Sequence, residues 1–190
     1  MTCRIADAAV HGEVAVRRWA PEDGAELQAV IRASAGHLRP RMVWVDAWVA
    51  DDCDPAATID AWNAAWADGG DLHVGIFERG VLSGAGGLHR RLGPDGLEIG
   101  YWLGPHATGR GLATIAAGLL TDLAFADPAI ARVRIAHCVT NDASAGVPSR
   151  LDFPLLGERS CERPLGPADT GTDRIWEVGR AAWPGYASLA

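Results

Sequence analysis

The spacing of hydrophobic and polar positions changes several times along the chain, and each change marks the edge of an expected element. Alternation of apolar and polar residues is typical of strands with one buried face. This pattern predicts strands at residues 14–19, 72–77, 81–89, 97–103, 132–139, 153–163 and 172–178.

Apolar residues three or four positions apart predict amphipathic helices between these strands. Pro21 and the pair Asp54-Pro55 are start signals, whereas Gly69-Gly70 and Pro128 are stop signals. The helices are expected at residues 21–34, 37–48, 55–69, 109–126 and 141–151.

The order of these elements predicts the fold class. One strand and three helices precede three strands, and a helix, a strand, a helix and two strands follow. This order predicts a mixed α/β fold with a largely antiparallel sheet flanked by helices, rather than a regular βαβ array. The absence of a repeat or a long linker predicts a single domain over residues 1–190, with a flexible N-terminus at 1–13 and a C-terminal tail at 181–190.

The composition favours a soluble globular protein, with 48% hydrophobic and 22% charged residues. The N-terminal segment lacks the apolar stretch of a signal peptide, and no apolar run reaches the length of a membrane span. We therefore expect a cytoplasmic location and no membrane partner. The net charge of −7 argues against nucleic acid and favours a cationic or amine partner.

The types of reactive residue exclude some chemistry. All basic residues are Arg, so no lysine can act in catalysis. The cysteines are scattered without a Cys-x-x-Cys pair, so neither a metal site nor a disulfide framework is expected. Cys138, within an apolar strand, is interpreted as a small core residue.

The segment from Thr108 to Thr114 places Gly109 and Gly111 between an expected strand and an expected helix. Glycines allow close approach of the backbone to a ligand, and the free amides at the start of a helix attract phosphate. The segment has no Lys for a Walker loop, and it departs from the dinucleotide fingerprint. A phosphate-bearing ligand of another kind is therefore predicted, the alternative being a helix start with glycines for packing.

The stretch Gly109-Arg110-Gly111-Leu112-Ala113 resembles the acyl-CoA pyrophosphate loop of the GNAT acyltransferase superfamily, although Thr108 stands where the family has Gln or Arg. Further segments resemble the branch of ribosomal-protein N-terminal acetyltransferases. They are Leu97–Leu103, His37–Pro40 with Trp44, and Asn141–Phe153, where Pro148 and Asp152 depart from the pattern.

The resemblance implies a single GNAT-like domain whose sheet is splayed at the acyl-CoA site, with acetyl-CoA as acyl donor and no metal. It places the contacts to acetyl-CoA at Tyr101, Trp102, Leu103, Thr108, Gly109, Arg110, Gly111, Leu112, Ala113, Thr114, Asn141 and Ser144. A backbone N–H near Trp102 or Leu103 would bind the oxyanion.

The resemblance also implies roles for three side chains. Glu98 matches the general base, and its alternative is a carboxylate paired with Arg90 or Arg91; His89 and His137 are alternative bases.

Ser144 matches the hydroxyl that protonates the leaving thiolate, and its alternative is an ordinary helical serine. Asn141 matches a contact to the pantetheine arm, and its alternative is a helix cap.

Two tryptophan pairs, Trp44 with Trp48 and Trp62 with Trp66, have the spacing of one helical face. They are interpreted either as core or as walls of the acceptor cleft, and Trp44 and Trp48 are the candidates for substrate contact. An acidic surround of the cleft would suit an ammonium group.

The resulting hypothesis is an N-acetyltransferase that acts on a small-molecule amine or a peptide N-terminus. The alternatives are a transferase for a longer acyl-CoA or a carrier-protein thioester, and a non-catalytic acyl-CoA-binding module. A homodimer is compatible with these features.

Overall fold

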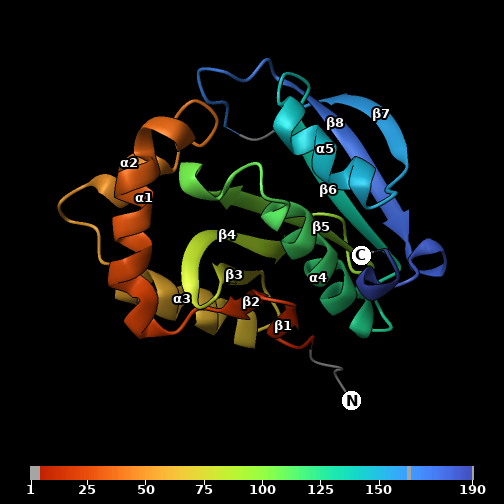
Figure 1. The fold of residues 1–190 in the computed structure, drawn as a ribbon, viewed down its shortest axis with the longest axis horizontal. Helices are drawn as coiled ribbons and strands as arrows, with labels where there is room; N and C mark the ends of the chain where they lie inside the picture. Colours follow the sequence, from red (N-terminus) through yellow and green to blue (C-terminus); the bar gives the residue numbers. More distant parts are fainter. Residues whose placement is uncertain (1–4, 162–163, 190) are drawn as a thin grey trace.

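The computed structural model describes residues 5–161 and 164–189, which form one eight-stranded sheet with helices on both faces (Figure 1). The strand order is β1-β2-β3-β4-β5-β6-β8-β7, and only the β5–β6 pair is parallel. The strands are β1 (Ala8–His11), β2 (Val14–Arg18), β3 (Leu72–Glu78), β4 (Val81–His89), β5 (Gly96–Leu103), β6 (Arg132–Cys138), β7 (Leu155–Ser160) and β8 (Thr172–Gly179). The expected mixed α/β fold with a largely antiparallel sheet is confirmed.

The helices divide into two groups that cover opposite faces of the sheet (Figure 1). The first group is α1 (Gly24–Leu38), α2 (Val45–Val49) and α3 (Pro55–Ala67), and the second is α4 (Leu112–Ala126) and α5 (Asp142–Arg150). Each group buries most of its apolar residues in its own core, Trp66 of α3 excepted. Because side chains alternate along a strand, β5 contributes Leu97, Ile99 and Leu103 to the α4 core and Trp102 to the α1–α3 side.

Local sequence explains where several helices begin. The side chain of Asp54 accepts a hydrogen bond from the N–H of Ala57 at 3.0 Å, and Pro55 takes the first helical position of α3. The side chain of Asn141 accepts a hydrogen bond from the N–H of Ser144 at 3.3 Å, which caps α5. The alternative interpretation of Asn141 as a helix cap is confirmed, and its contact to the pantetheine arm stays a prediction.

The expected break after Ser34 and the expected helix over residues 37–48 are wrong. α1 continues through Gly36 to Leu38, because its apolar face stays buried through Ala35 and Leu38 and this burial outweighs the low helix propensity of glycine. Only Val45–Val49 then forms α2.

Both ends of the chain carry structure that the sequence patterns did not indicate. Residues 8–11, within the N-terminus expected to be flexible, form β1, which pairs with β2 through a turn at Gly12 with φ of +57°. In the expected C-terminal tail, the indole of Trp183 donates to Asp122 at 2.6 Å, and Tyr186 is buried.

The strand expected at residues 153–163 is shorter in the structure, where β7 spans Leu155–Ser160. Phe153 is buried and lies before β7. Residues 162 and 163 lie outside the described residues. Within the described part of the chain, no helix has the length and apolarity needed to cross a bilayer.

Candidate active site

The sheet splits between β5 and β6. The two strands pair only from Gly96–Ile99 against Arg132–Ile135, although β5 continues to Leu103 and β6 to Cys138. The N–H of Gly104 donates to the oxygen of Ser83 at 2.9 Å. In the antiparallel β4–β5 pair, every second residue of β5 directs its backbone N–H and C=O toward β4, as Gly104 does at the strand end. The N–H and C=O groups of Tyr101 and Leu103 therefore point to the other side, which β6 leaves open. These backbone groups are available to an extended ligand.

The segment before α4 has the backbone geometry of an anion site. Gly109 and Gly111 adopt φ of +73° and +79°, and a Cβ on either would meet no atom within 4 Å. Their backbone is therefore open to a ligand. The first amides of α4, at Leu112–Thr114, have no intrahelical partners because they begin the helix. No side chain caps this end, so these amides are free to bind a ligand. The helix dipole adds to their attraction for an anion.

Two side chains of this segment are engaged elsewhere. The hydroxyl of Thr108 donates to the oxygen of Pro105 at 3.0 Å. The guanidinium of Arg110 donates to the carboxylate of Glu78 at 2.7 Å. These contacts leave the backbone at Gly109 and Gly111 uncovered.

A cavity of about 1070 Å³ lies beside the gap. Several of the predicted site residues line this cavity, from elements on both sides of the gap. They are Trp44, Trp48, Glu98, Tyr101, Trp102, Asn141 and Ser144. Leu103 and residues 108–114 do not line it. The segment before α4 is thus a separate, exposed feature at the end of β5.

Tryptophans form one wall of the cavity. The Trp44 and Trp102 rings lie 5.9 Å apart, and the Trp48 and Trp62 rings lie 5.6 Å apart. Trp66 instead packs against the core on the α4 side. Three of the four paired tryptophans, Trp66 excepted, therefore line the cavity, Trp48 is also a core residue, and contact of Trp44 and Trp48 with an acceptor stays a prediction.

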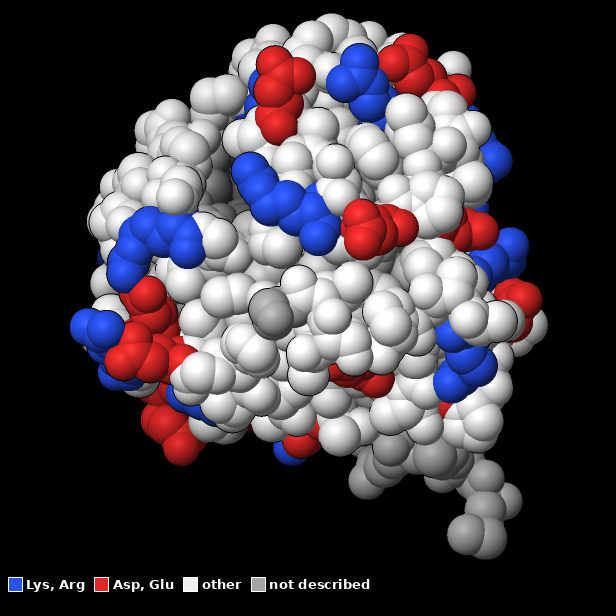
Figure 2. Space-filling view, turned by 45° about the vertical axis from the view of Figure 1, so that its right-hand side comes forward, with Lys and Arg blue, Asp and Glu red and all other residues white. Residues whose placement is uncertain are grey.

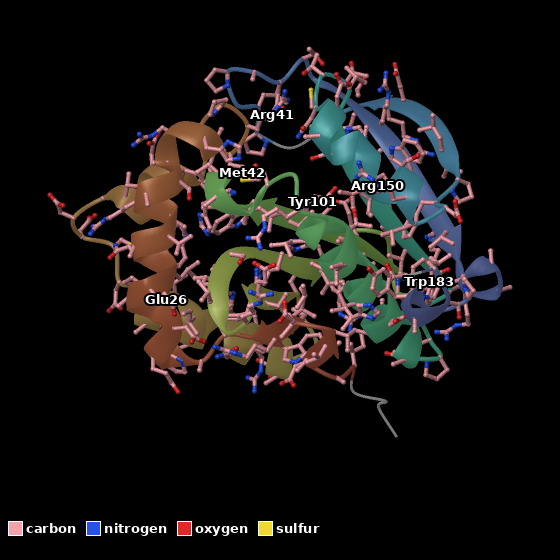
Figure 3. The ribbon with its side chains drawn as sticks, viewed as in Figure 1. Glu26, Arg41, Met42, Tyr101, Arg150 and Trp183 are labelled. Carbon is pink, nitrogen blue, oxygen red and sulfur yellow. The ribbon has the colours of Figure 1, made fainter. Side chains whose placement is uncertain are left out.

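Tyr101 connects the two sides of the gap. Its hydroxyl donates to the backbone oxygen of Ser144 at 3.2 Å, and burial raises the pKa of this hydroxyl. Figure 3 shows Tyr101 in the middle of the molecule, whereas Arg41 and Met42 lie toward the segment that precedes β8. The guanidinium of Arg41 donates to the oxygen of Thr140 at 3.0 Å, so the α1–α2 connection is also tied to the loop after β6.

Glu98 lies in the cavity wall but has a partner. Its carboxylate accepts a hydrogen bond from the guanidinium of Arg91 at 2.9 Å, and its side chain is 18% exposed. This contact is one of the two pairings that the sequence left open as an alternative to a catalytic role.

The two candidate histidines differ in how many of their ring nitrogens have a hydrogen-bond partner. His137 uses both ring nitrogens, because Nδ1 lies 2.9 Å from the oxygen of Cys138 and Nε2 accepts the indole N–H of Trp176 at 3.0 Å. His89 uses Nδ1, which lies 2.8 Å from the carboxylate of Asp71. That hydrogen bond is the main reason why the pKa of Asp71 is lowered to about 2.

Sequence reasoning missed Asp71 and His73, both of which lie near His89. Burial lowers the pKa of His73 to about 4, and the ring of His73 stacks on Trp62 at 4.5 Å. No motif includes these residues. The alternation of β3 could have indicated that His73 shares a face with the cavity, but only the register of β3 with β4 places Leu72 opposite Leu88 and so Asp71 beside His89.

The charges around the cavity are mixed, so the acidic surround that would suit an ammonium group is not present among its lining residues. The charged lining residues are Arg41, Arg91, Arg134, Arg159, Glu98, Asp169 and Asp173. Several are paired, as in the Arg134–Glu177 contact at 2.7 Å. On the face that Figure 2 presents, acidic and basic groups are likewise interspersed.

The candidate site thus combines a split sheet, an uncapped helix start and a cavity beside the split. Residues 13–154 match the family model described as the acetyltransferase (GNAT) domain, and the chain belongs to this family. The predicted family and the predicted acyltransferase class are confirmed.

Comparisons with individual proteins agree. The provisionally named ribosomal N-acetyltransferase YdaF of Bacillus subtilis (strain 168) is 28% identical over 145 residues, which cover 76% of this chain and 79% of YdaF. The structure of RimL, a ribosomal L7/L12 α-N-protein acetyltransferase, in complex with coenzyme A has a TM-score of 0.80 at 18% identity, covering 90% of this chain and 96% of RimL.

The microcin C7 self-immunity acetyltransferase MccE, in complex with acetyl-CoA and AMP, has a TM-score of 0.79 at 21% identity, covering 89% and 93% of the two chains. At such identities these two structures show the shared fold.

Proposed function

We propose that this protein transfers an acetyl group from acetyl-CoA to a primary amine, either the N-terminus of a peptide or the amine of a small molecule. The observation that carries the proposal is the unpaired end of β5 beside the open start of α4. An extended pantetheine arm would pair with the free backbone of β5, and the pyrophosphate would lie against the first amides of α4.

The proposed chemistry uses groups on both sides of the gap. The backbone N–H of Tyr101 or Leu103 would stabilise the oxyanion of the tetrahedral intermediate. Asn141 would contact the pantetheine arm with the amide nitrogen that its helix cap leaves free. The hydroxyl of Ser144 would protonate the departing thiolate. Glu98 and His89 both line the cavity from which the amine would approach.

The choice of acceptor is supported by the cavity and by the relatives. The relatives YdaF and RimL are named for acetylation of ribosomal proteins, and MccE is named for microcin immunity. A tryptophan wall suits the side chain of a peptide's first residue or the apolar part of a small amine. A cytoplasmic location and a reaction without a metal ion remain parts of this proposal.

The test is a thiol-release assay with acetyl-CoA and a panel of acceptors, in which mass spectrometry identifies the product. The panel includes peptides with N-terminal Ser or Ala, their N-terminally blocked forms, and small aliphatic and aromatic amines. Acetylation of one class above the hydrolysis background supports the proposal. Tight acetyl-CoA binding without transfer to any amine would instead favour the non-catalytic module, and faster reaction with a longer acyl-CoA would favour the other alternative.

A further inference from the structure

We propose that His89, oriented by Asp71, accepts the proton of the acceptor amine, an inference that rests on the proposed acetyl transfer. The amine nitrogen forms a bond to the acetyl carbon, and the bond from that carbon to sulfur breaks. The amine proton passes to Nε2 of His89, and the leaving thiolate takes up a separate proton. His89 then releases its proton to solvent, so the residue returns to its starting state.

The free atoms of the candidate bases favour His89. His137 has partners on both ring nitrogens, whereas Glu98 is held in an ion pair with Arg91 through Oε1. Among the described residues, the recorded hydrogen bond of His89 involves Nδ1 alone, so Nε2 retains a site for a proton. A general base needs an available lone pair within reach of the substrate.

The position of the His89 ring also fits this role. His89 lies opposite Glu98 in the β4–β5 register, and two residues further along β5 is Gly100. A Cβ added to Gly100 would lie 3.0 Å from Nε2 of His89, so the ring extends over the space that this glycine leaves empty. The free nitrogen therefore lies over Gly100, where the unpaired end of β5 begins and the thioester would lie.

Asp71 holds the His89 imidazole in the tautomer that this reaction needs. One carboxylate oxygen lies 2.8 Å from Nδ1 of His89, and the other accepts the backbone N–H of Arg90 at 2.8 Å. A carboxylate bound in this way is an acceptor, so Nδ1 carries the hydrogen and Nε2 carries the lone pair. The same negative charge stabilises the imidazolium that forms when the proton arrives.

The other titratable and charged groups around His89 are His73 on β3, Glu98 on β5 and Arg91 after β4. The ring of His73 lies 5.5 Å from that of His89. Burial lowers the pKa of His73 to about 4, so this residue is neutral at pH 7 and does not repel a protonated His89. Arg91 is partly neutralised by Glu98. The surroundings therefore permit the transient positive charge.

The decisive experiment measures single-turnover rates of wild-type protein and of His89→Ala across pH, after the wild-type protein has been shown to acetylate an amine. We expect the rate of His89→Ala to fall by about 10²- to 10⁴-fold, with the acetyl-CoA affinity retained and the acid limb of the pH–rate profile lost. Added imidazole should restore part of the rate. A purely structural role of His89 would not produce this rescue.

Three further variants separate the possible explanations. Asp71→Asn should lower the rate and alter the pH profile, because an amide can donate to Nδ1 and so favour the tautomer with hydrogen on Nε2. Glu98→Gln should keep the acid limb. His37→Gln is the matched control, because His37 is exposed and does not line the cavity, and it should react at the wild-type rate.

The outcomes distinguish the two levels of the proposal. If the wild-type protein acetylates no amine, the proposed function itself fails. If the wild-type protein is active and His89→Ala keeps its rate and pH profile, or if Glu98→Gln alone loses the acid limb, the assignment of His89 is overturned.

A divalent cation is the remaining explanation to exclude, because potential ligand atoms of Asp71, His73 and His89 all lie within 4.8 Å of one another. Activity that survives EDTA supports the proton transfer. Activity that is lost to EDTA and restored by zinc overturns it.

Discussion

Replacing Gly111 by Glu tests where acetyl-CoA binds, and Gly93 provides a matched control. Both glycines are exposed, with φ of +79° and +82°, and a Cβ on either meets no atom within 4 Å. Gly93 lies before β5 and Gly111 after it, beyond opposite ends of this eight-residue strand. At ~3.3 Å per residue the strand itself is roughly 25 Å long.

The two substitutions should cost similar stability. A side chain in the left-handed region costs about 1–2 kcal/mol. For a chain of this size, each kcal/mol lowers the melting temperature by about 2–4 °C. Thermal denaturation should therefore show a fall of about 2–8 °C for Gly111→Glu and for Gly93→Glu alike.

Only Gly111→Glu should weaken the binding of acetyl-CoA. A carboxylate about 5 Å from each of two phosphate charges repels each by about 0.8 kcal/mol at the dielectric constant of water, and by several times more near a protein surface. The sum of about 1.6 kcal/mol or more corresponds to a loss of at least about tenfold in affinity. Isothermal titration calorimetry would measure this loss, which should shrink at high salt.

The control separates this effect from a general loss of structure. Gly93→Glu should bind acetyl-CoA as the wild-type protein does, and Gly111→Ala should lose less affinity than Gly111→Glu. If folded Gly111→Glu binds acetyl-CoA with wild-type affinity, the pyrophosphate does not lie against the start of α4.

Two further predictions concern the chemical step and the response to pH. Ser144→Ala should reduce the single-turnover rate and leave the acetyl-CoA affinity unchanged, because a proton donor to sulfur acts mainly in the transition state; a wild-type rate would return Ser144 to the role of an ordinary helical serine. Burial lowers the pKa of His73 from 6.5 to about 4, so the unfolded chain binds the extra proton first and stability should fall as the pH drops from about 6.5 to 4. The loss should be of the order of 3 kcal/mol, or ~6–12 °C in melting temperature. His73→Gln should flatten this part of the curve, and an unchanged slope would show that another group controls it.

Local patterns in the sequence were sufficient for most of the architecture. Alternation located the strands that build the sheet, because each strand buries one face and the side-chain period is two. Gly109 and Gly111 indicated the open loop before α4, since left-handed backbone strongly favours glycine. Asn141 indicated the start of α5 because a cap acts within three residues.

The same patterns failed where a local signal was weak or its partner was distant. β1 is too short to show alternation, and it forms because β2 offers an edge to pair with. The end of α1 depends on the burial of Ala35 and Leu38 against other elements, and no local residue marks it before Pro40.

The candidate site shows this limit most clearly. The sequence by itself determined that Glu98, Ser144, Asn141 and a glycine loop occur in an order that matches the acetyltransferase family, because each belongs to a short motif. Only the tertiary structure decided which of their atoms are free. It pairs Glu98 with Arg91, turns Arg110 toward Glu78 and joins Asp71 to His89 across 18 positions of sequence. Such contacts depend on strand register and on the packing of helices against the sheet, and these arise from the whole chain rather than from any one segment.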